Sequence, residues 1–257
     1  MTQTLRSGIK TPLKDIEAAL FNNNGEMQLN IKGLKINIMG NIGSGKSTLI
    51  NLIKLKYGKF IQTYPEPMDL WLWYLNFMTN NKDKNMIAFF QCIVNRWFYT
   101  IKHVELPKCK TSAVLIERSA TEAKFVFMKY YEDKQIFNDM ELKWLNYNYE
   151  ENKMDYDLHI FVNTSVETCI SRKNSRGRIC EKLSVKEELE YWNVLHNNYV
   201  ALLHELKQQG KNVYYINGEL DETKVFKQFE EILLQHNVYV SKQLKVVKLT
   251  KNKINNK

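Results

Sequence analysis

The residues of this chain best suited to chemistry lie at 40–48, where the sequence reads GNIGSGKST. The spacing G-x-x-x-x-G-K-S is that of a phosphate-binding loop, whose glycines let backbone N–H groups turn toward phosphate oxygens. In such a loop the lysine reaches the β- and γ-phosphates and the serine hydroxyl binds Mg²⁺, here Lys46 and Ser47. We therefore predict that a nucleoside triphosphate binds to Gly40, Asn41, Ile42, Gly43, Ser44, Gly45, Lys46, Ser47 and Thr48.

A candidate general base is Glu66, in the segment YPEPMDLW at 64–71. Pro65 and Pro67 restrict the backbone on both sides of this glutamate and keep a helix from starting early. A carboxylate beside a phosphate loop can accept the proton of an attacking hydroxyl group. The alternative interpretation is an ordinary loop glutamate.

A second acidic candidate ends an apolar run in SAVLIERSA, residues 112–120. A buried strand that ends in an acid is typical of the Walker-B arrangement, so we expect Glu117 to hold Mg²⁺ directly or through water. Arg118 follows at the same end of the strand and is expected to pair with Glu66. A buried ion pair without a catalytic role would have the same sequence, and both interpretations can hold together.

Three arginines gather in CISRKNSRGRICEK at 169–182, namely Arg172, Arg176 and Arg178. Guanidinium groups bind phosphate oxygens in a bidentate manner and remain charged at any working pH. A segment of this kind can close over a transferring phosphoryl group and exclude water. A solvated basic loop is the alternative, and the phosphate loop upstream favours the functional interpretation.

The elements that must position these groups alternate between apolar runs and helical patterns, which is typical of a parallel sheet covered by helices. The predicted strands are 34–39, 59–63, 113–117, 157–162 and 212–216. The predicted helices are 46–57, 68–78, 86–106, 120–131, 139–152, 166–174, 184–209 and 222–235. Because ligands collect at the carboxyl ends of parallel strands, the candidate groups should lie together there.

Two details of the predicted helices can be checked against a structure. Capping-box spacing pairs Thr164 with Glu167 and Ser184 with Glu187, which predicts two helix starts. In the helix 184–209 an apolar stripe is predicted to be core or subunit interface without a chemical role. Its residues are Leu189, Trp192, Leu195, Tyr199, Leu202 and Leu206.

Composition limits the class of protein. Apolar residues make up 44% of the 257 residues, which is ample for a globular core, and no run is long enough to span a membrane. The net charge is +9, but six lysines lie in the tail 237–257, so nucleic-acid binding is not expected. We predict a poorly ordered extension at 1–30, one domain at 31–236 and a solvated tail.

Location follows from the chain start and the cysteines. The first residues lack the apolar segment of a secretory signal, and Asp15 and Glu17 argue against a mitochondrial transit peptide. The four cysteines form no C-x-x-C pair, so we expect reduced cysteines in a cytoplasmic protein and no structural zinc.

Together these stretches resemble the deoxyribonucleoside kinase family, which includes cellular thymidine and deoxycytidine kinases and herpesvirus thymidine kinases. The resemblance runs from Leu34 to Glu231 and is carried by GNIGSGKST, EPMDLW, FFQ, ERSATEAKFVF and RKNSRGRICE. It implies an α/β P-loop kinase with a five-stranded parallel sheet flanked by helices and an arginine-rich lid. It also implies phosphorylation of a deoxynucleoside 5′-hydroxyl by ATP and Mg²⁺ in nucleotide salvage, and a homodimer.

The resemblance also implies roles for individual residues. Glu66 matches the general base, with Arg118 supporting it and Lys46 on the phosphates. Arg172, Arg176 and Arg178 match the lid arginines on the donor phosphates, and NGELDE at 217–222 matches the loop that stacks on the donor adenine. The residues matching the acceptor site are Trp71, Phe90, Gln91, Phe98, Arg118, Ala123, Phe127 and Glu181, of which Gln91 would bind the base edge and Glu181 the sugar 3′-hydroxyl.

Two positions bear on which base is accepted. In the deoxycytidine kinase pattern an aspartate and an arginine stand where this chain has Ala123 and Phe98. The small, uncharged residue resembles the thymidine-accepting members, so we predict a preference for thymidine. The family's second 3′-hydroxyl contact, a tyrosine, has no match in register, and Tyr74 is a weak substitute.

Two rival interpretations stay open. A nucleoside monophosphate kinase such as thymidylate kinase shares the fold and an arginine lid, although EPMDLW and the helix with Gln91 favour a nucleoside acceptor. A P-loop ATPase or nucleic-acid-binding module would use the basic tail as its contact but leaves Glu66 unexplained. Affinity for DNA with a strong salt dependence would favour the second rival.

Overall fold

The computed structural model describes residues 33–81, 84–177 and 185–236. The chain divides into two compact units, one formed by residues 32–225 and the other by residues 1–31 with 226–257. Of the second unit, the structure describes residues 226–236, which are helical. The predicted extension at 1–30 and the basic tail lie outside the described residues and stay predictions.

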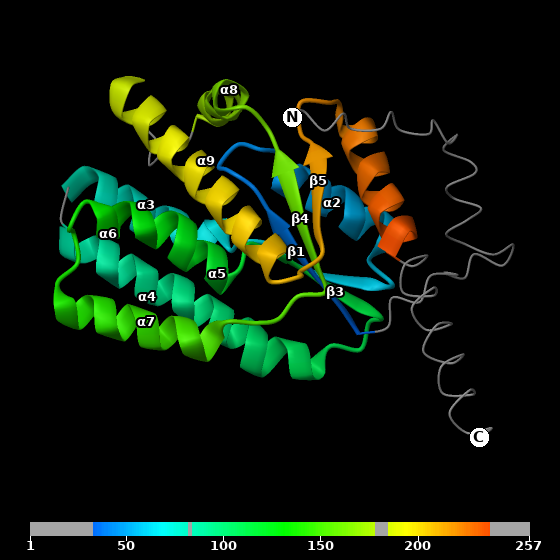
Figure 1. Cartoon of the computed structure of the whole chain (residues 1–257), viewed down its shortest axis with the longest axis horizontal. Coiled ribbons are helices and arrows are strands. Elements are labelled where there is room, and N and C mark those ends of the chain that lie inside the picture. Colours follow the sequence, from blue (N-terminus) through cyan, green and yellow to red (C-terminus); the bar gives the residue numbers. More distant parts are fainter. Residues whose placement is uncertain (1–32, 82–83, 178–184, 237–257) are drawn as a thin grey trace, which may run out of the picture. The chain divides into compact units, whose positions relative to one another are not determined.

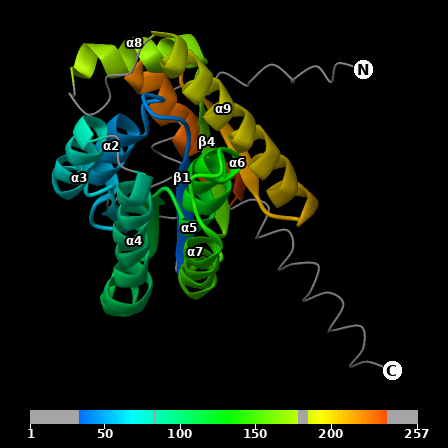
Figure 2. The same cartoon turned by 90° about the vertical axis from the view of Figure 1, so that its left-hand side faces the viewer.

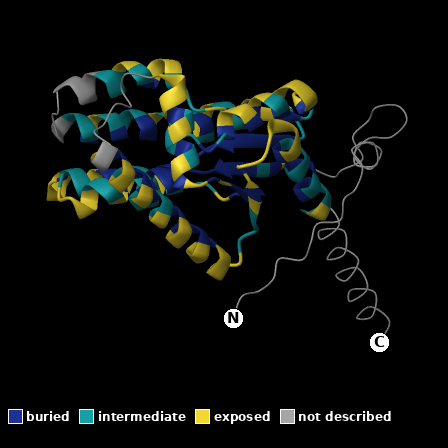
Figure 3. Ribbon diagram, turned by 90° about the horizontal axis from the view of Figure 1, so that it is seen from above, coloured by how far each residue is buried: buried dark blue, intermediate teal, exposed yellow. Residues whose placement is uncertain are grey.

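The unit 32–225 is built on a five-stranded, all-parallel sheet, which confirms the predicted α/β fold class. The strand order is β2-β3-β1-β4-β5. The strands are β1 (Leu34–Met39), β2 (Ile61–Tyr64), β3 (Ala113–Glu117), β4 (Leu158–Asn163) and β5 (Val213–Asn217). The central strands are short apolar runs, as expected for strands buried on both faces. In Figure 3 they form the buried centre of this unit.

Helices lie on both faces of the sheet (Figure 1). They are α2 (Lys46–Tyr57), α3 (Met68–Asn81), α4 (Lys84–Thr100), α5 (Ala120–Glu122), α6 (Lys129–Asp133), α7 (Asp139–Asn152), α8 (Val166–Arg176) and α9 (Val185–Gln208). Two π-helical turns, η1 (Ile101–Glu105) and η3 (Ala123–Met128), and a 3₁₀ turn, η2 (Leu106–Lys108), complete the set. A last helical stretch covers 222–236. Among these described residues, no helix is both long and apolar enough to cross a bilayer.

The face of the sheet opposite α2 carries the core that surrounds the functional residues. Val114 and Ile116 of β3 pack with Trp71, Val94 and Phe98 of α3 and α4. A second cluster joins β1 and β4 to the apolar side of α9. Figures 1 and 2 both show α4 and α7 side by side on this face, with α9 crossing it. These helices therefore form the walls of the space above the strand ends.

One sequence-based expectation about the helix starts is wrong. Ser165, not Thr164, caps α8, because its hydroxyl oxygen accepts from Thr168 N. The Thr164 hydroxyl instead donates to the carbonyl of Ser44 at 3.0 Å and so ties α8 to the phosphate loop. Leu189 of the predicted apolar stripe is 45% exposed, so for this residue only the subunit-interface alternative stays open as a prediction. The predicted cap Ser184 lies outside the described residues.

Candidate active site

The phosphate loop connects β1 to α2 and packs against α8. Gly43 has a φ of +85°, and a Cβ there would lie too close to the Cys169 carbonyl oxygen of α8. Only glycine fits both the left-handed backbone and this close approach. Gly45 precedes α2 with a φ of +101°, which turns the loop into the helix. The helix N-terminus therefore faces the loop interior and favours an anion there.

Lys46, the predicted phosphate-binding lysine, is the first residue of α2. Its side chain is buried, and its Nζ donates to the Asn41 carbonyl at 2.9 Å. Burial, with a smaller contribution from the nearby Arg118, lowers the pKa of Lys46 to about 8. A bound phosphate would supply the negative charge that restores a protonated lysine.

Ser47 and Glu117 meet at the first turn of α2. The Ser47 hydroxyl donates to Glu117 Oε1 at 3.0 Å, and Glu66 N donates to Glu117 Oε2 at 3.1 Å. Mg²⁺ takes oxygen ligands and is commonly held by one or two protein groups together with substrate phosphates. The described residues contain no cluster of three or more His, Cys, Asp or Glu side chains that could hold a metal ion. The Ser47 hydroxyl and the Glu117 carboxylate are two oxygen ligands, which fits a Mg²⁺ ion held by one or two protein groups and by phosphates.

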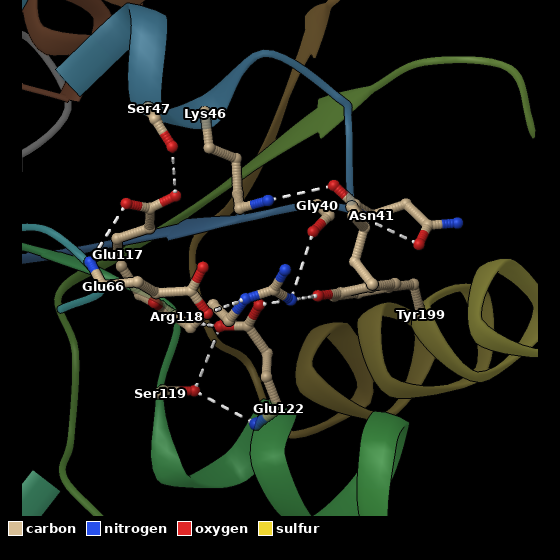
Figure 4. Close-up of polar contacts among 12 residues, drawn as sticks. Gly40, Asn41, Lys46, Ser47, Glu66, Glu117, Arg118, Ser119, Glu122 and Tyr199 are labelled. Atoms are coloured by element: carbon tan, nitrogen blue, oxygen red, sulfur yellow. Dashed lines mark hydrogen bonds and ion pairs between the residues drawn. The ribbon is translucent and has the colours of Figure 1, made fainter. Parts of the chain in front are cut away.

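Glu66 and Arg118 form an ion pair beside the loop, in which Arg118 is buried and Glu66 is partly buried (Figure 4). Arg118 has a φ of 65°, which carries the chain from β3 into α5 while its N–H still bonds the Ile38 carbonyl at 3.0 Å. The guanidinium carbon also lies 4.4 Å from the ring centroid of Phe127. This strained backbone position turns the guanidinium toward Glu66 across the end of the sheet.

The electrostatics suit Glu66 to accept a proton. Burial raises the pKa of Glu66 above its ordinary value, and Glu117 adds to this, while Arg118 and Lys46 oppose it. A carboxylate whose pKa is raised is a stronger base, yet the arginine keeps its ionised form accessible. The arrangement can therefore take a proton from a hydroxyl group placed beside Glu66.

A cavity of about 430 Å³ opens next to Glu66. It is lined by every described residue of the predicted acceptor site, namely Trp71, Phe90, Gln91, Phe98, Arg118, Ala123 and Phe127. The sequence did not predict Met68, Leu75, Tyr130, Tyr131 or Tyr191, which line it as well. Tyr74 does not line it and instead packs against Trp73 and Phe89. Glu181 lies outside the described residues.

A second cavity, also of about 430 Å³, lies over the phosphate loop. It is lined by Gly43, Ser44, Gly45, Lys46, Ser47 and Thr48, by Arg172 and Arg176, and by Gly218, Leu220 and Glu222 of the segment NGELDE. Arg172 donates to the Gly218 carbonyl at 2.9 Å, so it also fixes that segment. Arg178 lies outside the described residues.

The two cavities meet at Gly43, Lys46 and Arg176, which line both. Ile42 lines only the first cavity, the one beside Glu66, and Gly40 and Asn41 line neither cavity. Gly40 and Asn41 instead hold side chains that line the cavities, because the Gly40 carbonyl accepts from Arg118 and the Asn41 carbonyl accepts from Lys46. A group in one cavity can thus reach a group in the other past a buried lysine and an arginine.

Sequence reasoning missed two polar groups next to this junction, Tyr199 and Glu122. Tyr199 accepts from Arg118 at 2.6 Å and donates to Glu122 at 3.1 Å, as Figure 4 shows. Tyr199 belongs to the predicted apolar stripe of α9, whose spacing does not predict these two polar contacts. A signal for Glu122 exists in the sequence, because Ser119 and Glu122 have the spacing of a capping box directly after β3.

The chain is similar to known proteins of one family. A sequence model described as deoxynucleoside kinase matches residues 36–241. A protein of fowlpox virus named a probable deoxycytidine kinase is 30% identical over 206 residues, covering 73% of this chain and 80% of that one. Human mitochondrial thymidine kinase 2 is 25% identical over 175 residues, covering 63% of each chain. The structure of deoxyadenosine kinase from M. mycoides with bound dCTP matches with a TM-score of 0.63 and 25% identity, over 78% of this chain and 98% of that one.

Proposed function

This chain belongs to the deoxynucleoside kinase family, and we propose that it transfers the γ-phosphate of ATP to the 5′-hydroxyl of a deoxynucleoside, with thymidine preferred. The observation that carries the proposal is the junction of the two cavities. We call the cavity beside Glu66 the acceptor cavity and the cavity over the phosphate loop the donor cavity. A nucleoside in the acceptor cavity and the phosphates of ATP in the donor cavity would meet at Lys46 and Arg176, beside the ion pair of Glu66 and Arg118.

In this proposal Glu66 accepts the proton of the 5′-hydroxyl as its oxygen attacks the γ-phosphorus. The bond from the γ-phosphorus to the β–γ bridging oxygen breaks, and ADP leaves with that oxygen. Arg118 holds the carboxylate toward the acceptor and adds positive charge next to the developing negative charge. The low exposure of these side chains, 9% for Arg118 and 13% for Glu66, supports this, because a low-dielectric site strengthens such interactions.

On the donor side, the loop amides, Lys46, Arg172 and Arg176 would bind the phosphates. Mg²⁺ held at Ser47 and Glu117 would neutralise phosphate charge during transfer. Gly218 and Leu220 line the cavity where the adenine would lie. The lid contacts of Arg178 and Glu181 remain predictions, as does a homodimer.

The preference for thymidine rests on the wall made by α4 and η3. Ala123 leaves room beside the buried Phe98 for the 5-methyl group, and Gln91 lines the cavity from α4. Neither α4 nor η3 contributes an acidic side chain to the lining, so the 4-amino group of cytosine would find no carboxylate acceptor there. Phe127 lines the cavity and offers a ring on which a base could stack.

Deoxycytidine is the second candidate, because the fowlpox relative is named a probable deoxycytidine kinase. Gln91 can present either its carbonyl or its amino group, so the pocket discriminates between pyrimidines by about 1–3 kcal/mol at most. We expect deoxycytidine to be accepted less well than thymidine, and purines less well again.

The test is phosphate transfer from ATP, with Mg²⁺, to each of the four deoxynucleosides and to thymidine monophosphate. We expect transfer to thymidine with the highest kcat/KM. Transfer to thymidine monophosphate alone would show that the chain is a monophosphate kinase, and ATP hydrolysis without any acceptor product would show that it is an ATPase. A preference for deoxyguanosine would refute the proposed base pocket but not the kinase activity.

A further inference from the structure

Glu122 is a buried acid that lines neither cavity. Its side chain is 0% exposed at the end of α5, and both carboxylate oxygens are occupied. Oε1 accepts from the Tyr199 hydroxyl at 3.1 Å, whereas Oε2 accepts from Asn37 Nδ2 at 3.0 Å and from the Ser119 hydroxyl at 3.3 Å. Burying a carboxylate costs free energy, and these three donors offset part of that cost.

The group on which Glu122 acts is reached through Tyr199 (Figure 4). A guanidinium can only donate, so the Tyr199 hydroxyl oxygen accepts from Arg118 Nη1, and the hydroxyl proton must point to Glu122. Burial raises the pKa of Tyr199 well above its ordinary value, so the tyrosine keeps that proton at neutral pH. The same guanidinium uses Nε to bind Glu66. One directed chain of contacts therefore connects Glu122 to the proposed base.

Both protonation states of Glu122 can be accommodated. Among the residues that the structure describes, no donor reaches the buried Asn37 Oδ1. If the Asn37 amide rotates by half a turn, Oδ1 faces Glu122 and can accept a hydrogen bond from a protonated Oε2, while Oε1 still accepts from Tyr199. The amide then serves as donor to the carboxylate and as acceptor to the carboxylic acid.

The charged and titratable groups facing Glu122 come from four separate parts of the chain. Arg118 precedes α5, Lys46 lies on α2, Tyr199 on α9, and Tyr156 between α7 and β4. Burial raises the pKa of Glu122 to about 7, although Arg118 and Lys46 oppose this. The carboxyl thus changes charge within the pH range in which an enzyme is assayed.

We propose that Glu122 is a positioning residue that acts through Tyr199 to hold the Arg118 guanidinium against Glu66, and that it holds it more firmly when ionised. This inference rests on the proposed function of Glu66. A hydrogen bond to an ionised acceptor is about twice as strong as one to a neutral acceptor. The ionised Glu122 therefore polarises the Tyr199 hydroxyl and strengthens its acceptance from Arg118.

The first test compares Glu122→Gln with the wild type by kcat/KM for thymidine between pH 6 and pH 8.5. The glutamine keeps the shape and the acceptor for Tyr199 but cannot ionise. We expect kcat/KM to be lower by about tenfold at pH 8, with the ratio of wild type to variant falling toward one at pH 6. Glu66 is present in both proteins, so its protonation lowers both activities and the ratio reports the part that depends on residue 122. A ratio that is constant with pH would overturn the proposal, because a merely structural role predicts it.

Tyr199→Phe removes the connection itself. We expect this variant to lose about as much activity at pH 8 as Glu122→Gln, and the double variant to lose no more than either single one. Independent, additive losses would overturn the proposed chain. Glu205→Gln, which changes an exposed acid on the same helix, is the matched control and should leave the pH profile unchanged.

A second readout needs no activity. The pKa of Glu122 lies above its ordinary value of 4.5 in the folded protein, so its contribution to stability is present at low pH and is lost as the pH rises to about 7. Glutamine does not titrate, so Glu122→Gln loses no stability in this way as the pH rises. The Tm of Glu122→Gln relative to wild type should therefore rise between pH 5 and pH 7.5, and a constant difference would overturn the ionisation of Glu122. A wild type that phosphorylates no nucleoside would refute the proposed function instead.

Discussion

Replacing Ala123 with aspartate tests how the base is chosen. Ala123 is 8% exposed and lines the acceptor cavity next to Phe98, which is 1% exposed. The new carboxylate would occupy the space left for the thymine methyl group and would face the 4-carbonyl oxygen. It would have no positive partner on α4, because Phe98 occupies the place from which one could reach it.

The expected loss follows from two effects. Excluding a methyl group from a fitted pocket costs about 1–3 kcal/mol, and leaving a buried acceptor opposite a carbonyl oxygen costs about 1–3 kcal/mol. If each effect contributes about 1.4 kcal/mol, kcat/KM for thymidine falls about 100-fold. Ala123→Asn has nearly the same volume without the charge and can donate to the carbonyl, so it should lose only about tenfold. Deoxycytidine should lose less with aspartate, because its amino group can donate to the carboxylate.

The assay is the steady-state kcat/KM of all three proteins for thymidine and deoxycytidine at saturating ATP. Unchanged Tm and ATP affinity would establish that the variants are folded. If Ala123→Asp turns over thymidine within twofold of the wild type, Ala123 does not face the thymine methyl group and the pocket has been oriented wrongly.

Three further predictions concern the phosphate side. Because burial lowers the pKa of Lys46 to about 8, ATP binding should be accompanied by proton uptake that increases between pH 7 and pH 9. Calorimetry in buffers of different ionisation enthalpy measures this uptake, and Lys46→Arg should abolish it. Equal heats of ATP binding in all buffers would contradict the prediction. Arg176→Ala should lower kcat by about 100-fold with little change in thymidine affinity, and Arg96→Ala, at an exposed position, should leave both kcat and affinity unchanged. A loss confined to KM would remove Arg176 from the transition state. Gly43→Ala should weaken ATP binding more than tenfold by displacing the loop from α8, while Gly210→Ala, which has a positive φ and open space, should not; equal ATP affinity of both variants would contradict the close approach.

Much of this architecture could be predicted from the sequence because the signals are local. The strand from Leu34 to Met39 and the helix that begins at Lys46 have the predicted bounds, since an apolar run and a phosphate-loop motif both lie within a few residues. The capping of α8 was misassigned because Thr164 and Ser165 are adjacent and chemically alike. Which hydroxyl caps the helix depends on where β4 ends, and helix boundaries are uncertain by a residue or two.

The polar chain behind Arg118 could not be predicted, because it depends on tertiary placement. Tyr199 fits the apolar stripe of α9 by its spacing, and periodicity predicts burial without saying what its hydroxyl meets. That hydroxyl meets Arg118 because α9 crosses the end of the sheet at that point. Tyr130, Tyr131 and Tyr191 line the acceptor cavity for the same reason, from elements far apart in the sequence.

The central claim is that Glu66 takes the proton of the acceptor hydroxyl at the junction of the two cavities. Its most direct test is the rate of phosphate transfer from ATP to thymidine by Glu66→Gln, measured together with the Kd of ATP. We expect kcat to fall by about 10²–10⁴-fold, the range for a positioned proton acceptor, while the Kd of ATP stays within a factor of about two because the phosphate loop is untouched. A Glu66→Gln enzyme with kcat near that of the wild type would contradict the claim.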